Sequence, residues 1–315
     1  MINFGKVAVI GCGAVGSSIA FALMQNPFVK ELVLLDYKKE KAEGEALDIY
    51  HGTPFVKDTK VYSGEYKDLK DAAVIVISAG VGPKPGQTRF DQMKIHLSIL
   101  ESILDQLKPI EPEGCILLVS NPVDILTAKT LKVTRLPRNR VFGSGTVLDS
   151  ARFKTILSSH CGVNIEDVHG YILGEHGESA FPAWSLTNIG GIPATAFLKA
   201  SGVKDLAKEE KQILSEVVSV GYDIVKKKGM TCYGIALSVT HIVESILTDS
   251  KAILPISVLQ EEEGLEGVAL SLPTMVGRNG AERVLPVTLS ASEKKELLAS
   301  ASKLRKVLSD LDITF

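Results

Sequence analysis

The sequence lacks the features that mark membrane, secreted and nucleic-acid-binding proteins. No run of apolar residues reaches the roughly 18 that a membrane-spanning helix requires. The formal net charge is −2, and no cluster of lysine and arginine is long enough to predict a nucleic-acid surface. A predicted strand begins within the first few residues, which leaves no room for a signal peptide. We therefore expect a protein that binds neither membranes nor nucleic acids.

Cysteine is scarce, and its spacing argues against disulfides and metal sites. Cys12, Cys115, Cys161 and Cys232 are widely separated, and none of them forms a Cys-x-x-Cys pair. Each is expected to act as a small buried hydrophobic residue, as in proteins of the reducing cytoplasm. His160 and Cys161 are the one adjacent His/Cys pair. The sequence thus predicts a cytoplasmic protein without a bound metal.

The residues that are present are those of a globular protein with a large interior. Hydrophobic residues make up 45% of the 315 positions and charged residues 23%, which is ordinary for a soluble protein. A chain of this length is long for a single hydrophobic core. Two closely packed domains are therefore expected.

The first 145 residues alternate between short aliphatic runs and helical patterns. Strands are predicted at 7–10, 32–35, 60–63, 74–78, 116–120 and 141–142. Strands that alternate with helices predict a doubly wound parallel sheet with right-handed crossovers. Such sheets bind ligands beyond the carboxyl ends of their strands, so Gly80 and Asn121 should line a binding cleft.

The pattern changes after about residue 145, which predicts a first domain at 1–145 and a second at 146–315. The second begins with a helix at 147–160 and continues with strands at 169–173 and 184–189. A helical stretch at 203–249 is broken at Gly229, and antiparallel strands at 252–259 and 267–276 precede a final helix at 291–310. This order predicts an α+β domain with long helices. Because no exposed linker separates the halves, we expect them to be packed firmly together.

The stretch from residue 6 to 36 predicts a dinucleotide site. Gly11, Gly13 and Gly16 form a Gly-x-Gly-x-x-Gly pattern between a predicted strand and a helix. The first permits a tight turn, the second lets the main chain approach a pyrophosphate at the helix start, and the third allows close helix–strand packing. Asp36 ends the next strand and is placed to accept hydrogen bonds from a ribose 2′-hydroxyl. Its carboxylate would repel a 2′-phosphate, and Tyr37 follows in place of an arginine, so NAD is favoured over NADP.

Acidic and basic residues in the second half suggest proton transfer. His176 lies in a Gly-Glu-His-Gly-Glu segment after a predicted strand. Asp149 and Arg152 are three residues apart on a predicted helix and so share one face. Taken singly, each has an ordinary structural interpretation, as a satisfied polar side chain or a surface ion pair. The same holds for Asn121 in an Asn-Pro turn and for Arg89 after a Gly/Pro-rich segment.

Taken together and in order, these motifs resemble the lactate/malate dehydrogenase family. The resemblance covers essentially the whole chain, and it rests on the opening glycine pattern, Lys-Pro-Gly-x-Thr-Arg, Asn-Pro-Val-Asp, Leu-Asp-x-Ala-Arg, Gly-Glu-His-Gly and Lys-Gly-x-Thr-x-Tyr-Gly. It implies a Rossmann-type NAD-binding domain followed by an α+β catalytic domain. It also implies an NAD-dependent oxidoreductase that acts on a small 2-oxo or 2-hydroxy acid.

The resemblance assigns the same roles that the chemistry of these residues favours. His176 would be the acid/base that protonates the keto oxygen, and Asp149 would fix its tautomer and favour the imidazolium. Arg152 would hold the substrate carboxylate with its planar pair of donors. Arg89 would stabilise charge on the carbonyl oxygen, carried by a lid at 81–90 that excludes water on closure.

Family likeness also supplies the remaining predicted contacts. Asn121 should hydrogen-bond near the reacting oxygen and the cofactor, and Thr231 should lie beside the substrate side chain. The full set expected to bind NAD comprises Gly11, Gly13, Val15, Gly16, Asp36, Lys41, Tyr66, Gly80, Val81, Ser102, Val119, Asn121 and Ser144.

The substrate is predicted from Pro83, the third residue after the glycine that ends the fourth strand. Malate dehydrogenases of the family have arginine at this position, and most lactate dehydrogenases have glutamine. Proline has no side-chain or main-chain donor for a second carboxylate, so a dicarboxylic substrate would lose its bidentate partner. We expect reversible hydride transfer between NADH and pyruvate. A broad 2-hydroxy-acid specificity, with longer substrates, or a malate specificity remains the alternative.

Lys154 and His169 leave two interpretations open. Family members activated by fructose 1,6-bisphosphate usually have arginine where Lys154 stands, and His169 matches their second phosphate contact. The two residues either form an effector site or are a solvated helix lysine and a histidine at a strand start. The family also implies a homotetramer, a dimer of dimers.

Two other classes of protein share parts of this pattern. NAD-dependent glycosidases have a similar opening but need a metal, and the chain is short for that class. A structural protein on an enzyme scaffold would need none of His176, Asp149, Arg152 and Arg89. Substrate profiling with NADH separates these classes from a 2-hydroxy-acid dehydrogenase.

Overall fold

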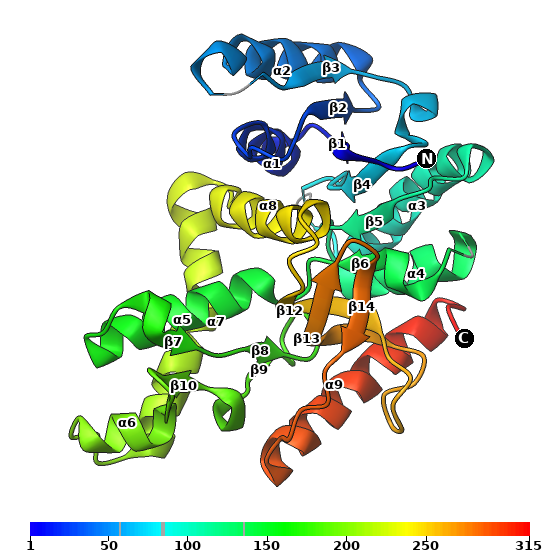
Figure 1. The fold of residues 1–315 in the computed structure, drawn as a ribbon. Helices are drawn as coiled ribbons and strands as arrows, with labels where there is room; N and C mark the ends of the chain where they lie inside the picture. Colours follow the sequence, from blue (N-terminus) through cyan, green and yellow to red (C-terminus); the bar gives the residue numbers. More distant parts are fainter. Residues whose placement is uncertain (57, 83–85, 135) are drawn as a thin grey trace.

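A nine-stranded sheet forms the centre of the molecule in the computed structural model (Figure 1). The structure describes residues 1–56, 58–82, 86–134 and 136–315, and of Arg89 the main chain. The strand order is β14-β13-β12-β6-β5-β4-β1-β2-β3. This order places β1 and β4 side by side, with the chain running outward in both directions from them, as a doubly wound sheet requires.

The first six strands are parallel, as the sequence predicted. They are β1 (Asn3–Ile10), β2 (Glu31–Leu35), β3 (Lys60–Ser63), β4 (Ala72–Ile77), β5 (Cys115–Leu118) and β6 (Val141–Gly143). The central strands β4, β5 and β6 are entirely apolar and buried because both faces of the sheet are covered there. All six predicted strand positions are confirmed, with ends that differ by a few residues.

Strands of the second half extend this same sheet. They are β12 (Ala252–Leu259), β13 (Ala269–Gly277) and β14 (Gly280–Val284), and they pair antiparallel with one another. Ser257 of β12 pairs with Gly143 of β6, so hydrogen bonding is continuous between the two halves. The sequence predicted β12 and β13 but not β14, whose five residues include Glu282 and Arg283.

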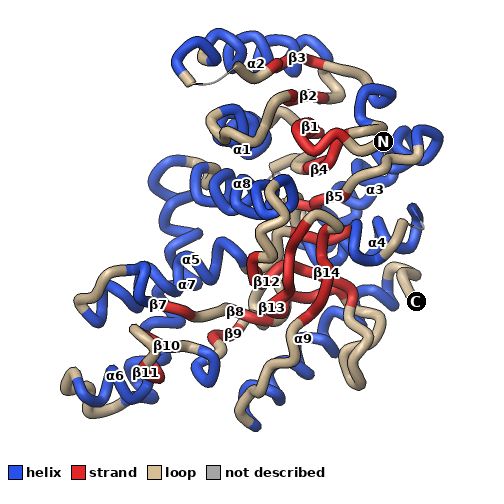
Figure 2. Tube along the Cα trace, in the orientation of Figure 1, coloured by secondary structure: helices blue, strands red, loops and turns tan. Residues whose placement is uncertain are grey.

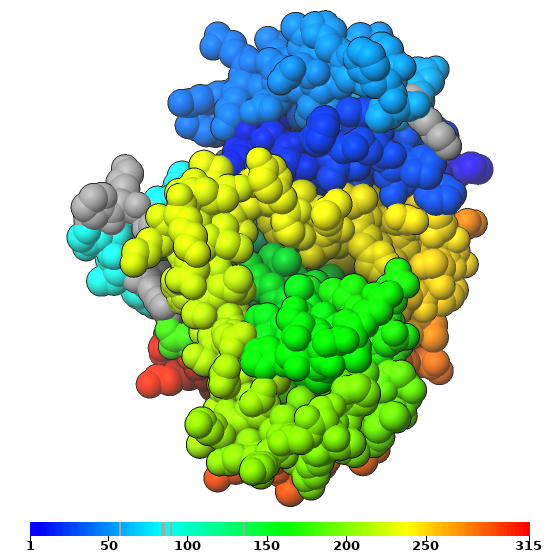
Figure 3. Space-filling view, turned by 90° about the vertical axis from the view of Figure 1, so that its left-hand side faces the viewer, coloured from blue at the N-terminus to red at the C-terminus, as the bar shows by residue number. Residues whose placement is uncertain are grey.

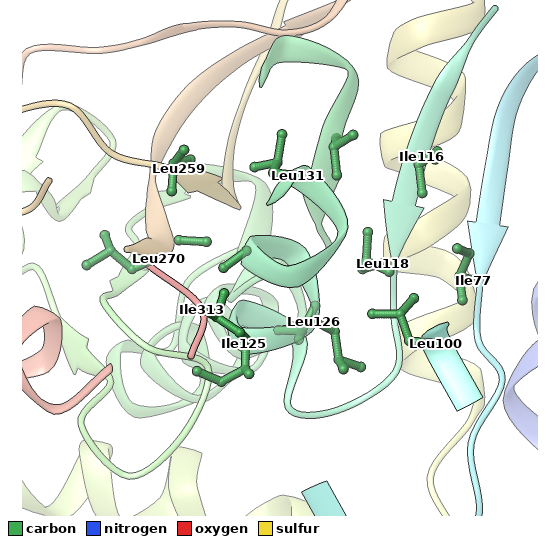
Figure 4. Close-up of a cluster of buried hydrophobic side chains, with 14 of the residues drawn as sticks. Ile77, Leu100, Ile116, Leu118, Ile125, Leu126, Leu131, Leu259, Leu270 and Ile313 are labelled. Atoms are coloured by element: carbon green, nitrogen blue, oxygen red, sulfur yellow. The ribbon is translucent and has the colours of Figure 1, made fainter. Parts of the chain in front are cut away.

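Helices cover the two faces of the sheet and bury alternate residues of its strands (Figures 1 and 2). Val7 and Val9 of β1 point into one core with α1 (Ala14–Met24), α2 (Lys39–His51) and α8 (Tyr233–Leu247). Ala8 and Ile10 point into the opposite core with α3 (Arg89–Leu107), α4 (Val123–Thr134) and α9 (Ala291–Asp310). The alternation follows from the two-residue repeat of a strand. Figure 4 shows the second of these cores, where Ile125 and Leu126 of α4 lie among side chains of several elements.

A third, smaller core lies outside the main sheet. It joins α5 (Val147–Cys161), α6 (Ala194–Ala200) and α7 (Leu206–Lys228) to two small sheets. The strands of these sheets are β7 (Val168–His169), β8 (Ile172–Leu173), β9 (Phe181–Pro182), β10 (Asn188–Ile189) and β11 (Ile192–Pro193). Phe153 of α5 meets the edge of Trp184 with ring centroids 5.2 Å apart. This core supports α5, the helix that carries Asp149 and Arg152.

Two strand predictions in this region were wrong. The expected strand at 169–173 is two strands, β7 and β8, in different sheets. Gly170 lies between them and is packed so closely that a Cβ there would lie 2.8 Å from Phe153. The first half of the expected strand at 184–189 is instead a 3-10 turn at Trp184–Leu186, and its last two residues form β10.

The break predicted at Gly229 is confirmed. Gly229 ends α7 with a φ of 86°, a left-handed conformation that glycine adopts without strain. The chain then turns through Thr231 into α8. None of the helices described is both long enough and apolar enough to cross a membrane.

Candidate active site

The glycine turn between β1 and α1 has the geometry of a dinucleotide cradle. Gly11 has a φ of 97°, and at Gly16 a Cβ would collide with the carbonyl oxygen of Gly11 and lie 2.7 Å from the Ser78 hydroxyl. A side chain at Gly13 would meet no atom within 4 Å, so the outer side of the turn is open to a ligand. Helix α1 begins directly after Gly13, and the unpaired main-chain N–H groups of a helix start suit a pyrophosphate.

Asp36, at the end of β2, is fixed beside this turn. One carboxylate oxygen accepts the N–H of Cys12 at 2.8 Å, and the other accepts the N–H of Lys38 at 3.0 Å. These two bonds set the orientation of the carboxylate against the glycine turn. The position agrees with the predicted role, in which the free lone pairs accept the hydroxyls of a ribose.

Two serines tie together neighbouring strand ends at this edge of the sheet. The hydroxyl of Ser78, just after β4, donates to the carbonyl of Gly11 at 2.9 Å. The hydroxyl of Ser120, just after β5, donates to the carbonyl of Ala79 at 2.6 Å. Sequence analysis singled out neither serine. The available signal was a hydroxyl residue directly after a buried apolar strand, where it can reach the neighbouring strand end.

His96 of α3 makes a third link of this kind. Its ring is 8% exposed and lies between the main chains of Val81 and Asn121. Nε2 is 3.2 Å from the N–H nitrogen of Val81 and 3.0 Å from its carbonyl oxygen, while Nδ1 contacts the carbonyl of Asn121. His96 thus connects two residues that sequence analysis assigned to the cofactor. Sequence analysis assigned His96 itself no role, because helical spacing does not reveal a contact with two loops.

The structure brings His176, Asp149 and Arg152 together. His176 follows β8, and the preceding Gly174 is bonded to Ser271 of β13 in both directions, at 2.9 and 3.0 Å. Nδ1 of His176 lies 2.7 Å from one oxygen of Asp149, whose other oxygen lies 3.0 Å from the Arg152 guanidinium. With Nδ1 held by the carboxylate, Nε2 is the ring nitrogen that can exchange a proton with a substrate.

Neighbouring charges adapt this group to acid/base chemistry. Burial lowers the pKa of His176, but the hydrogen bond and charge of Asp149 outweigh burial and leave the pKa above its ordinary value. Burial raises the pKa of Asp149, but the bonds and charges of His176 and Arg152 leave it below its ordinary value. The histidine therefore stays protonated to higher pH than a free imidazole, with an ionised carboxylate behind it.

Arg152 has room to reach a ligand. Its side chain is 18% exposed. The guanidinium faces the small residue Gly221 of α7, where a Cβ would lie 3.6 Å from it. One nitrogen of the Arg152 guanidinium is bonded to Asp149, and the planar group has further N–H donors for a carboxylate.

Other predicted residues are placed less decisively. Thr231 is half-buried in the turn between α7 and α8, Lys154 is half-buried on α5, and His169 is exposed on β7, which contacts α5. Pro83 and the side chain of Arg89 lie outside the described parts, as does the middle of the expected lid at 81–90. The main chain of Arg89 begins α3, after a capping box formed by Thr88 and Asp91.

The predicted cofactor residues lie mainly at the carboxyl ends of the parallel strands. Val119 and Ser144 are buried after β5 and β6, while Gly80, Val81 and Asn121 are exposed there. The remaining ones are Val15, half-buried on α1, Lys41, exposed on α2, Tyr66, half-buried after β3, and Ser102, exposed on α3. Their contacts with NAD stay predictions. Figure 3 shows the face on which α5 (green), α7 and α8 (yellow) and the N-terminal half (blue and cyan) meet.

Comparison with known proteins identifies the family. Residues 5–143 match the model of the lactate/malate dehydrogenase NAD-binding domain, and residues 146–312 match that of the alpha/beta C-terminal domain of the same family. The chain belongs to the lactate/malate dehydrogenase family. NAD is accordingly its cofactor, and the glycine turn and Asp36 fit that molecule.

Relatives within the lactate/malate dehydrogenase family match along nearly the full length. An L-lactate dehydrogenase of Thermoanaerobacterium saccharolyticum is 46% identical over 98% of this chain and 99% of the relative. One from Clostridium perfringens is 44% identical, with 98% of each chain covered. The ligand-bound structure of the minor L-lactate dehydrogenase from Enterococcus mundtii has a TM-score of 0.94 at 37% identity, covering 98% of this chain and 99% of that one. Within the described residues, no group of three or more His, Cys, Asp or Glu is arranged to hold a metal ion.

Proposed function

We propose that the chain is an L-lactate dehydrogenase that reduces pyruvate to L-lactate with NADH and catalyses the reverse reaction. The observation that carries the proposal is the contact of His176 with Asp149, with Arg152 on the same carboxylate, in a chain of this family. A proton donor and a carboxylate-binding fork are the two groups that reduction of a 2-oxo acid requires.

Each residue of the cluster then has a defined task. NADH, when bound, would supply the hydride that the keto carbon takes up. Nε2 of His176 gives its proton to the keto oxygen, which becomes the hydroxyl. Asp149 stabilises the imidazolium before transfer and holds the tautomer afterwards. Arg152 binds the substrate carboxylate and orients the keto group towards His176.

We assign supporting roles to residues at the edge of this cluster. Asn121, after β5, hydrogen-bonds near the reacting oxygen, and Thr231 lies beside the substrate methyl group. Arg89, delivered by closure of residues 81–90, stabilises the negative charge that develops on the carbonyl oxygen. Residues 1–145 form the NAD-binding domain, and residues 146–315 form the catalytic domain.

Selectivity for pyruvate is assigned to Pro83. Proline offers no donor to a second carboxylate, so oxaloacetate should be a poor substrate. Initial rates with NADH on pyruvate, oxaloacetate and longer 2-oxo acids test the assignment. Pro83→Arg should raise kcat/KM for oxaloacetate by about one to two decades, since a bidentate charged contact contributes roughly 1.5–3 kcal/mol. A wild-type preference for oxaloacetate would instead make the protein a malate dehydrogenase.

Regulation by fructose 1,6-bisphosphate is proposed for Lys154 and His169. If two subunits place these residues around one dyad, like charges repel until an anion neutralises them, and the effector then stabilises a homotetramer. Lysine makes a less directional phosphate contact than arginine. Rates at sub-saturating pyruvate near pH 6, with and without millimolar fructose 1,6-bisphosphate, and sedimentation under both conditions test this. Identical rates and sedimentation would leave both residues without an effector role.

We also propose that the enzyme works in the cytoplasm. Its four cysteines are free thiols, of which Cys12, Cys115 and Cys232 are buried. Burial raises the pKa of Cys12 to about 12, so this thiol is chemically inert at neutral pH. Fractionation of cells that produce the protein, with lactate dehydrogenase activity as the marker, tests the location.

A further inference from the structure

A carboxylate buried beside the catalytic histidine has no part in the mechanism so far. Asp124, the second residue of α4, is 3% exposed. Aspartate is rarely buried so completely unless it is paired, because loss of hydration disfavours the charged form. Its partners therefore indicate why it is placed there.

Both oxygens of Asp124 accept hydrogen bonds from elements other than α4. One accepts the main-chain N–H of His176 at 2.7 Å. The other accepts the hydroxyl of Ser257 at 2.5 Å. Ser257 is fully buried and lies in β12 where that strand meets β6. The carboxylate thus fastens the loop of the catalytic histidine to the junction of the two halves of the sheet.

A role as a helix cap does not account for this arrangement. An acidic residue in the first turn of a helix stabilises it through the helix dipole, and an exposed side chain is sufficient for that. Asp124 is instead turned inward, towards partners that are 52 and 133 residues away in the sequence. A bond from a main-chain N–H to a charged acceptor is also stronger than one to a neutral oxygen, so the loop gains a firm anchor next to the reacting ring.

We propose that Asp124 is a positioning residue for His176, which fixes the main chain of the histidine and supplies a second negative charge that favours its protonated form. The inference rests on the proposed function of His176 as the proton donor. When the histidine has given its proton to the substrate, the neutral ring is left near two carboxylates, Asp124 and Asp149. Their combined charge favours uptake of the next proton.

The charges around the ring are consistent with this role. Asp149 and Asp124 raise the pKa of His176, and Arg152 on α5 opposes them. Burial raises the pKa of Asp124 to about 6, against the effects of Ser257 and His176, and the nearby Glu175 contributes to the rise. Glu175 is itself paired with Lys303 of α9 at 3.0 Å. Asp124 is therefore ionised at neutral pH and becomes protonated in mildly acidic solution.

Asp124→Asn tests the proposal, because it keeps the shape of the side chain and removes the charge. The alkaline limb of kcat/KM for pyruvate reduction should move to lower pH, since loss of the Asp124 charge lowers the pKa of the ring. The acidic limb of lactate oxidation should move lower by the same amount. Above neutral pH the variant should thus lose more pyruvate reduction than it does at its optimum. In mildly acidic solution its lactate oxidation should be less impaired than at its optimum, or faster than that of the wild type. A purely structural defect would lower both rates at every pH and leave both midpoints in place.

Thr127→Val is the matched control. Thr127 is fully buried one turn further along α4, and its hydroxyl bonds within the helix to the carbonyl of Val123 at 2.8 Å. This substitution disturbs the same helix without touching the loop of His176. Its pH midpoints should coincide with those of the wild type. Coincident midpoints for Asp124→Asn as well would overturn the proposal.

A measurement without substrate keeps the test independent of the proposed function. The ring signals of His176, assigned by their loss in His176→Asn, can be followed by NMR from pH 5 to 9 in the wild-type protein. We expect a main titration of the ring and a smaller inflection near pH 6, where Asp124 titrates. A single inflection in the wild type would overturn the coupling even if Asp124→Asn did not fold. Failure of the wild type to reduce pyruvate would refute the lactate dehydrogenase proposal and leave this titration unaffected.

Discussion

The glycine turn proposed to bind NAD and the proposed catalytic cluster of His176, Asp149 and Arg152 are built in opposite ways. Gly11, Gly13, Gly16 and Asp36 come from one continuous strand–helix–strand unit, and their geometry is set by local main-chain conformation. The catalytic cluster draws its residues from α5, the loop after β8 and, through Asp124, the start of α4. The glycine turn and the His176 cluster share no residue. Substitutions should therefore affect cofactor binding and proton transfer separately.

The largest separation is expected from His176→Asn. Asparagine cannot deliver a proton at neutral pH, so kcat for pyruvate reduction should fall by about 10³-fold or more. NADH binding, measured by fluorescence titration, should stay within about twofold of wild type, because the proposed role of the ring is to protonate the keto oxygen and not to hold the adenosine half of the cofactor. Retention of a tenth of the wild-type kcat would show that another group donates the proton.

Asp149→Asn should have a smaller effect that depends on pH. The variant keeps His176 but removes the partner that raises its pKa. We expect a loss of roughly 10²-fold in kcat/KM at pH 8, where the imidazole with its lowered pKa is deprotonated, and a smaller loss at pH 6. The sign follows from the raised pKa, because pyruvate reduction requires the protonated ring and fails as pH rises through that pKa. A loss that is equal at both pH values would contradict the charge mechanism.

Asp36→Ala should change the cofactor site and leave proton transfer intact. Loss of a ribose acceptor and of a repulsive charge should shift the ratio of kcat/KM for NADH over NADPH by about one to two decades towards NADPH. The pH midpoint of pyruvate reduction should not move. Glu40→Ala, which removes a negative charge from the nearby first turn of α2, serves as the control and should leave the ratio within about twofold. An unchanged ratio in Asp36→Ala would remove this residue from the cofactor site.

Ser78→Ala should give the smallest of these effects. It removes one hydrogen bond to the carbonyl of Gly11, which contributes about 1 kcal/mol. We expect the KM for NADH to rise about two- to fivefold at nearly constant kcat. Ser18→Ala on α1 removes a hydroxyl that bonds to the exposed carbonyl of Ala14 within its own helix, and should change neither constant. Equal behaviour of the two variants would show that the strand-end link does not support the turn.

Most of the fold could be predicted because the two patterns used, apolar runs for strands and glycine for a helix break, are local in the sequence. Alternating apolar runs located all six parallel strands, and Gly229 marked the break between α7 and α8. The predictions failed where tertiary packing decides the conformation. One predicted strand is interrupted at Gly170, which packs tightly beside Phe153, and its two parts pair in different sheets. The charged residues of β14 do not predict a strand, because this strand is stabilised by its pairing with β13.

In the candidate site, too, local motifs could be recognised in the sequence, whereas contacts made by tertiary packing could not. Motifs located His176, Asp149 and Arg152, and the structure places them in contact. Asp124 was visible in the sequence as part of an Asn-Pro-Val-Asp turn, but its inward orientation depends on Ser257, far along the chain. Such a contact cannot be read from spacing, because it exists only after β12 has joined the sheet.

The pairing of β6 with β12 sets a limit on how the enzyme can be divided. A fragment that ended near residue 145 would carry an unpaired sheet edge at β6, and its complement would expose the apolar strand β12. Bare edges of this kind recruit strands from other molecules and promote aggregation. Exchange of the catalytic half between relatives must therefore preserve the seam around Gly143 and Ser257, where a methyl group on the glycine would lie 3.2 Å from the serine side chain. The two functional regions of the enzyme therefore share one continuous hydrogen-bonded sheet.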